Sequence, residues 1–132
     1  MNYLLDTHIL LWVRFSPNKL TKTQRTIIES PDEEKFISAI TIWEISLKYA
    51  LGKLDLGGDT PEIFTAGLQK IGIKSISPTQ EQYATFYLLP KVIKHKDPFD
   101  RMIIWHAMNS GLALISSDKK LPDYGIHGLT IA

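Results

Sequence analysis

The chain has 132 residues, of which 44% are hydrophobic and 22% are charged. This length and composition exclude a disordered or collagen-like chain, and we expect a single globular domain over residues 1–132. With no cysteine and a net charge of +1, disulfides, thiolate metal sites and a strong overall attraction to nucleic acid are also excluded.

Short apolar runs alternate with segments in which apolar residues recur every three or four positions. In chain order, the patterns predict a strand at 3–5, helices at 7–15 and 21–30, a strand at 36–40, helices at 41–54 and 60–71, a strand at 73–76, helices at 79–89 and 98–110, and strands at 112–115 and 129–131. This alternation predicts an α/β fold with a mostly parallel sheet of about five strands and helices on both faces, which is a three-layer sandwich.

Several predicted helices begin with a recognisable cap. The capping-box spacing, a Thr followed three residues later by Gln or Glu, occurs at Thr21–Gln24, Thr41–Glu44 and Thr79–Gln82. Asp97 before Pro98 marks another helix start, with Asp97 as the candidate N-cap.

The amino-terminal residues lack the basic start and the cleavage site of a signal peptide. Apolar runs such as 9–13 are also far shorter than the roughly 20 residues that a membrane-spanning helix needs. We therefore expect a soluble cytoplasmic protein that does not contact a membrane.

Four acidic residues fall where an open parallel sheet places its binding crevice. Asp6 and Asp118 follow predicted strands, while Glu44 and Asp100 lie one turn into predicted helices, where negative charge is favourable. A carboxylate cluster of this kind repels itself unless a cation binds to it. Oxygen ligands suit Mg²⁺ or Mn²⁺, and such a metal promotes phosphodiester hydrolysis by activating water.

The segments that carry these acids resemble the four acidic motifs of PIN-domain proteins, in the order typical of that family. They read MNYLLDTH at 1–8, SAITIWEI at 38–45, HKDPFDRMIIWHA at 95–107 and LISSD at 114–118. The first and third segments are similar in particular to VapC-like bacterial toxins. The resemblance implies a Mg²⁺- or Mn²⁺-dependent endoribonuclease with an RNA substrate, a homodimer, and a cognate antitoxin whose C-terminal segment occupies the active-site groove.

By the same resemblance, the metal-binding and catalytic residues are Asp6, Glu44, Asp100 and Asp118. Thr7 and Ser117 occupy supporting positions, and Asp97 is an additional acid of uncertain role. Each acid also has a structural interpretation as a helix cap, a capping-box member or a turn residue. The joint placement of all four at one sheet edge favours function for the set.

Basic residues border the third and fourth motifs, and we predict that Lys96, Arg101 and Lys119 contact the substrate phosphates. The three tryptophans, at 12, 43 and 105, lie at helical spacing among apolar residues and are interpreted as core residues. No histidine pair has a metal-binding spacing, so histidine ligands are not expected.

Two other functions remain open from the residues alone. A haloacid-dehalogenase-like phosphotransferase would use Asp6 as an aspartyl nucleophile, but His8 stands where that class needs a second Asp. A non-catalytic metal-binding α/β interaction module, such as a phospho-acceptor domain, would need paired acids near the first strand, which residues 2–6 do not offer.

Overall fold

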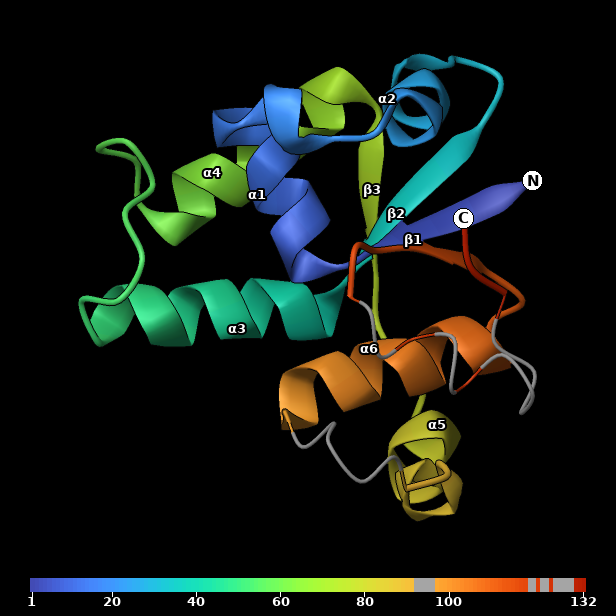
Figure 1. Ribbon diagram of the computed structural model, residues 1–132. Coiled ribbons are helices and arrows are strands. Elements are labelled where there is room, and N and C mark those ends of the chain that lie inside the picture. The colour runs from blue at the N-terminus through green and yellow to red at the C-terminus, as the bar shows by residue number, and fades with distance from the viewer. Residues whose placement is uncertain (92–96, 119–120, 122–123, 125–129) are drawn as a thin grey trace.

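The sheet of the protein is parallel, with four strands in the order β3-β2-β1-β4 (Figure 1). It is seen in a computed structural model that describes residues 1–91, 97–118, 121, 124 and 130–132. The strands are β1 (Asn2–Leu5), β2 (Glu34–Ser38), β3 (Ile73–Ile76) and β4 (Ala113–Ile115). All three strand pairings are parallel, so the carboxyl ends of the strands meet at one edge of the sheet.

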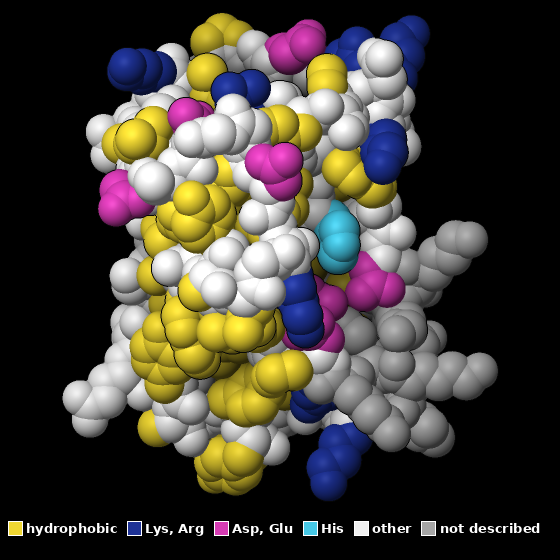
Figure 2. Space-filling model, turned by 90° about the vertical axis from the view of Figure 1, so that its left-hand side faces the viewer, with side chains coloured by type: hydrophobic (Ala, Val, Ile, Leu, Met, Phe, Trp, Pro, Cys, Tyr) yellow, Lys and Arg dark blue, Asp and Glu magenta, His cyan; other side chains and the backbone are white. Residues whose placement is uncertain are grey.

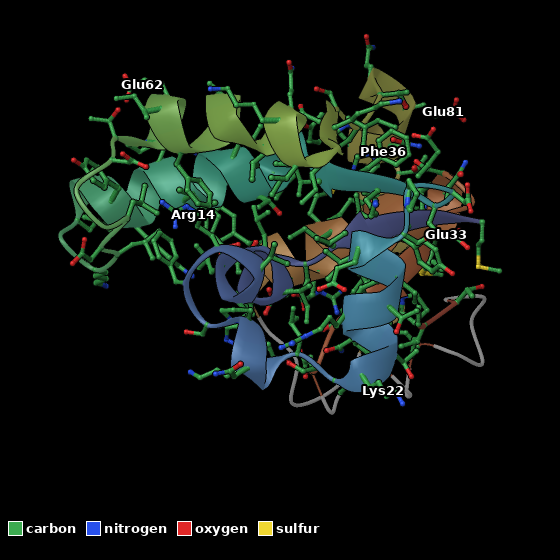
Figure 3. The ribbon with its side chains drawn as sticks, turned by 90° about the horizontal axis from the view of Figure 1, so that it is seen from above. Arg14, Lys22, Glu33, Phe36, Glu62 and Glu81 are labelled. Atoms are coloured by element: carbon green, nitrogen blue, oxygen red, sulfur yellow. The ribbon has the colours of Figure 1, made fainter. Side chains whose placement is uncertain are left out.

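Helices cover both faces of this sheet, as the sequence predicts. They are α1 (Thr7–Phe15), α2 (Lys22–Glu29), α3 (Ala39–Ala50), α4 (Pro61–Leu68), α5 (Gln80–Ala84) and α6 (Pro98–Asn109), with short 3₁₀ helices at Pro17–Lys19, Gln69–Ile71 and Phe86–Leu88. Figure 1 shows α1, α2 and α4 on one side of the strands and α5 and α6 on the other. Seen from above, Lys22 at the start of α2 and Glu62 in α4 lie at opposite borders of the layer that α1, α2 and α4 form (Figure 3).

Alternating strand residues supply two separate hydrophobic cores. In β1, Tyr3 and Leu5 face the core under α1, α2 and α4, whereas Leu4 faces the core under α6. In β4, Ile115 joins the first core and Leu114 the second. A strand whose side chains are buried on both faces reads as a continuous apolar run, which explains why these strands were recognisable in the sequence.

The predicted α/β sandwich is confirmed, with two corrections to its strands. The fifth strand expected at 129–131 is, within the described residues, a single parallel bridge between Leu114 and Ile131. The second strand ends at Ser38 and not at residue 40. Apolar β-branched residues suit a strand and a buried helix equally, so the run through Ile40 did not reveal where the strand ends.

The helix that follows this strand begins earlier than its capping-box pattern predicts. Ser38 is the N-cap of α3, and its hydroxyl accepts a hydrogen bond from the Ile40 N–H at 3.1 Å. The predicted box of Thr41 and Glu44 is therefore wrong, because both residues lie inside α3 and are buried. The boxes that begin at Thr21 and Thr79 are both formed.

Within the described residues, none of the helices combines the length and the apolar character needed to cross a bilayer. The expectation of a single domain over residues 1–132 stays a prediction.

The cap at Ser38 gives a first testable prediction. Ser38 is fully buried and also pairs with the Nδ1 atom of His106 in α6 at 2.9 Å, so it joins the start of α3 to another helix. We expect Ser38→Ala to lower the free energy of unfolding by about 0.5–2 kcal/mol, the usual cost of losing an N-cap. Urea unfolding at pH 7 measures this, with Ser46→Ala on the exposed face of α3 as the control. Equal stability of the two variants would contradict the assignment of the cap.

Candidate active site

The acidic residues predicted from the sequence converge at the carboxyl edge of the sheet. Asp6 follows β1, Asp118 follows β4, and Asp100 lies in the first turn of α6. These three carboxylates share a pocket of about 230 Å³, whose remaining lining residues are His8, Trp12 and Ser117. Figure 2 shows acidic, basic and histidine side chains gathered next to a broad hydrophobic area on this side of the molecule.

Asp6 is both a helix cap and a member of the site. Its Oδ1 atom accepts a hydrogen bond from the Ile9 N–H at 2.8 Å, which caps α1. Burial raises the pKa of Asp6, and this effect is opposed by hydrogen bonds from the Ser116 hydroxyl and the Ile9 N–H. The structural and the functional interpretations of Asp6 therefore describe the same carboxylate, which is buried, held in place and close to Asp118.

Glu44 lies below the surface, and both of its carboxylate oxygens bind protein groups. The residue is 1% exposed. Its Oε1 atom accepts a hydrogen bond from the Thr7 hydroxyl at 2.7 Å, and its Oε2 atom forms an ion pair with Lys48 one turn further along α3. The Thr7 hydroxyl also lies 3.1 Å from that of Thr41. Thr7 thus joins α1 to α3, and the supporting role that the resemblance implies for it stays a prediction.

The two acids at the start of α6 have different roles. Asp97 is exposed and is the N-cap: its Oδ1 atom accepts hydrogen bonds from the N–H groups of Phe99 at 2.9 Å and of Asp100 at 3.3 Å. Asp100 is half-buried and lines the pocket. The capping contacts hold the Asp97 carboxylate at the N-terminus of α6. Asp100 is therefore the acid of α6 that shares the pocket with Asp6.

The carboxylate of Asp100 experiences the repulsion expected of an acid cluster. Burial is the largest cause and raises the pKa of Asp100 to about 7. Repulsion from neighbouring carboxylates adds to this effect, in the order Asp97, Glu44 and Asp6, and is partly offset by His8. The protein therefore holds excess negative charge in a confined space, which a cation would relieve.

Ser116 contacts both Asp6 and Asp118, and the supporting role predicted for Ser117 stays a prediction. The Ser116 Oγ atom accepts a hydrogen bond from the Asp118 N–H at 3.0 Å, and its hydroxyl bonds the Asp6 carboxylate. Ser117 is exposed and lines the pocket. Side-chain direction alternates after a strand, so a sequence of two serines did not reveal which of them points inward.

The predicted basic border is only partly described. Lys96 and Lys119 lie outside the described residues. The guanidinium of Arg101 donates hydrogen bonds to the Pro90 carbonyl at 3.3 Å and to the Tyr124 hydroxyl at 3.1 Å, and it lies over the ring of Phe86. These contacts direct Arg101 toward the segments before and after α6, so its predicted contact with substrate stays a prediction.

Four residues near the site were not assigned to it from the sequence. Lys48 pairs with Glu44, Ser116 bonds Asp6, and His8 and Trp12 line the pocket. The i, i+4 spacing of Glu44 and Lys48 on one helix was the available signal for the ion pair. The interpretation of all three tryptophans as core residues is wrong for Trp43, which is 60% exposed and whose ring packs edge-on against that of Phe99 at 5.1 Å.

The donor set suits a hydrated hard cation. Among the described residues, no group of three acidic or histidine side chains is arranged tightly enough to hold one metal ion directly. Mg²⁺ binds proteins through one or two carboxylates and retains several water ligands, so it does not require such a group. Asp6, Asp100 and Asp118, which share one pocket, match this mode of binding.

Comparisons with known proteins agree with the architecture. The sequence profile of the family described as PIN domain matches residues 3–126. No curated protein sequence matches the chain.

Three solved structures have the same fold. VapBC2 from Rickettsia felis, solved with a DNA fragment from its promoter, is 17% identical with a TM-score of 0.70, covering 100% of this chain and 98% of that one. VapBC-1 from nontypeable Haemophilus influenzae is 22% identical with a TM-score of 0.66, covering 100% and 97%. DNA-bound VapBC from Salmonella typhimurium is 20% identical with a TM-score of 0.64, also covering 100% and 97%.

The division of roles between Asp97 and Asp100 gives the second prediction. In metal-free protein, the raised pKa of Asp100 costs stability increasingly as the pH rises from about 4 to about 7, because ionisation is harder in the folded state than in the unfolded state. Asp100→Asn removes this cost, so it should raise the free energy of unfolding by about 1–2 kcal/mol at pH 8 and by little at pH 4.

Asp97→Ala serves as the paired variant and should instead lower stability by about 0.5–2 kcal/mol, because it removes the N-cap. Thermal melts in EDTA at the two pH values measure both effects. A gain in stability at pH 8 for Asp97→Ala and a loss for Asp100→Asn would reverse the two roles.

Proposed function

Because the chain belongs to the PIN-domain family, we propose that it is a metal-dependent endoribonuclease that acts as the toxin of a type II toxin–antitoxin system. The observation that carries this proposal is the pocket at the carboxyl edge of the sheet, in which Asp6, Asp100 and Asp118 face one another. Three of the similar solved structures come from complexes named VapBC, which supports an antitoxin as the partner. The phosphotransferase and interaction-module alternatives have no comparable support.

The proposed metal ligands are the three carboxylates that line the pocket, and the proposed metal is Mg²⁺ or Mn²⁺. Glu44, the fourth ligand predicted from the sequence, does not line this pocket, and its role as a ligand stays a prediction. When bound, the ion supplies an activated water and neutralises charge on the phosphate. The chain itself fixes the carboxylates: the N–H of Ile9 and the hydroxyl of Ser116 orient Asp6, and the first turn of α6 carries Asp100. Because these supports are in place before substrate binds, little reorganisation is needed during the reaction.

The proposed substrate is single-stranded RNA, and the pocket has the groups to receive it. Trp12 lines the pocket together with Asp6 and His8, and an aromatic ring in such a place can stack on a base. A nucleotide that stacked there would bring its phosphate toward Asp100 and Asp118. Lys96 and Lys119 stay in this proposal as additional phosphate contacts.

An exposed apolar stripe on α3 supports the proposal of protein partners. Trp43, Leu47 and Leu51 follow one another at intervals of four residues and are 60%, 39% and 59% exposed. A contiguous exposed patch of this kind marks an interaction surface more often than a free one. We propose that the antitoxin and a second copy of the chain, as a homodimer, cover surfaces near the site.

Metal removal provides the third prediction. We expect purified protein to cleave a labelled single-stranded RNA with Mg²⁺ or Mn²⁺ and to lose cleavage in EDTA, because the acidic pocket needs a cation to approach an anionic phosphate. Adding excess Mn²⁺ back should restore the activity, and the Asp6→Asn protein serves as the control for contaminating nucleases. Full cleavage by the wild type in EDTA would exclude this mechanism.

Growth of the host cell provides the fourth prediction. Expression of the chain alone should arrest growth, and Asp6→Asn should relieve the arrest, because the isosteric amide removes the negative charge of the pocket's most buried acid. Equal protein levels and equal melting temperatures would show that the relief does not result from unfolding. A wild-type chain that accumulates without slowing growth would argue against the toxin function.

A further inference from the structure

Protein groups bind both carboxylate oxygens of Glu44, the most buried acid of the site. Thr7 donates to Oε1 at 2.7 Å, and Lys48 forms an ion pair with Oε2. The Glu44 side chain is 2% exposed, and the residue is absent from the lining of the pocket that Asp6, Asp100 and Asp118 share. A buried carboxylate is stable only with such partners, so Glu44 is already compensated without a metal ion.

Lys48 reaches solvent on α3, the helix that packs against α6. Its side chain is 38% exposed, in contrast to that of Glu44, so its charged end is accessible from outside. The pKa of Lys48 is lowered by burial but raised on balance by its bond to Glu44 and by the charges of Glu44, Asp97 and Asp100. The charges of Glu44 and of both acids at the start of α6 therefore favour the protonated form of Lys48.

Packing between two helices fixes this arrangement. The edge-on contact of Trp43 with Phe99, at 5.1 Å between ring centroids, joins the first half of α3 to the first turn of α6. Phe99 lies between Asp97 and Asp100 in the sequence. The helix that carries Glu44 and Lys48 is thereby held against the segment that carries the acids.

Lys48 is also distinctive among the cations that the structure describes. Of the three ion pairs found among those residues, the pair of Lys48 with Glu44 involves an acid of the site, whereas the pairs Met1–Glu33 and Lys74–Glu34 lie at the opposite ends of the strands. Arg101, which follows Asp100 directly, directs its guanidinium to the Pro90 carbonyl and the Tyr124 hydroxyl.

We propose that Lys48 binds a phosphate of the RNA beside the metal site, and that Glu44 is a positioning residue that holds Lys48 there and is not a metal ligand. This inference rests on the proposed ribonuclease function and names a substrate contact within it. Glu44 precedes Lys48 by four residues, which is the favourable orientation for such a pair on a helix. An ammonium group at the border of the carboxylates offsets their repulsion of a phosphate, and it leaves Asp6, Asp100 and Asp118 to the metal.

The test separates RNA binding from metal binding. RNA affinity is measured with a fluorescent single-stranded oligoribonucleotide at several salt concentrations, in the non-cleaving Asp6→Asn background. Mn²⁺ affinity is measured by electron paramagnetic resonance in chains that retain Asp6. Each experiment compares Lys48→Gln, Lys48→Arg, Glu44→Gln and the double variant with Lys74→Gln, which removes the lysine of a distant ion pair.

We expect Lys48→Gln to weaken RNA binding by about five- to tenfold and to reduce the dependence of log affinity on log salt by about 0.7, the value of one phosphate contact to a single strand. Lys48→Arg should retain most of the affinity. Glu44→Gln should resemble Lys48→Gln, and the double variant should be no worse than either, because both changes remove the same contact. The Mn²⁺ affinity should stay within about twofold of the wild type in every variant.

Several outcomes would overturn the inference. A tenfold loss of Mn²⁺ affinity in Glu44→Gln would show that Glu44 is a metal ligand. A clear gain of Mn²⁺ affinity in Lys48→Gln would show the same, with Lys48 occupying the place of the metal beside Glu44. If Lys48→Gln bound RNA as tightly as Lys74→Gln does, Lys48 would not contact a phosphate. Cleavage of RNA by the wild type would in that case still support the proposed function. A wild-type chain that neither binds nor cleaves RNA would refute both. If Lys48→Gln unfolds because Glu44 is left unpaired, the double variant carries the same test without an unpaired buried charge.

Discussion

The repulsion among carboxylates at one sheet edge is the constraint around which the site is built. Parallel strands bring Asp6 and Asp118 together, and α6 adds Asp100. Three acids have compensating groups: an N–H donor and a hydroxyl for Asp6, N–H donors for Asp97, and a hydroxyl and an ammonium group for Glu44. Burial and the neighbouring carboxylates raise the pKa of Asp100 to about 7. The remaining negative charge is the physical basis for expecting a cation.

The N-termini of two helices, α1 and α6, help to hold acids at this edge of the sheet. The N–H groups of the first turn attract negative charge, so an acid that caps a helix is stabilised at the sheet edge where the helix begins. At Asp6 the cap and the site residue are one carboxylate, whereas at α6 they are separate, with Asp97 as the cap and Asp100 in the pocket. A structural explanation for an acid therefore does not count against its function, since the N–H groups at the start of a helix also help to bury a functional charge.

Local patterns predicted the layers of the fold and the acids of the site, because strand and helix periodicities and the Asp–Pro helix start depend on neighbouring residues. They were misleading where a distant residue decides the outcome. Thr41 and Glu44 have the spacing of a capping box, yet Ser38 caps the helix with help from His106, which is 68 residues away. Trp43 has the appearance of a core residue, but its side of α3 is left open in this chain. The direction of the Lys48 side chain likewise depends on how α3 is rotated about its axis.

The contact between Ser38 and His106 joins the start of α3 to α6. The Ser38 hydroxyl binds the first turn of α3 and the imidazole of α6, the two helices that carry Glu44 and Asp100. Burial lowers the pKa of His106 to about 4, so the ring is neutral at neutral pH and the contact does not titrate there. The pair of Trp43 and Phe99 makes a second contact between the same helices, nearer to the pocket. Two contacts that carry no charge at neutral pH thus join the helices that carry Glu44 and Asp100, so this joint does not depend on the ionisation of those two acids.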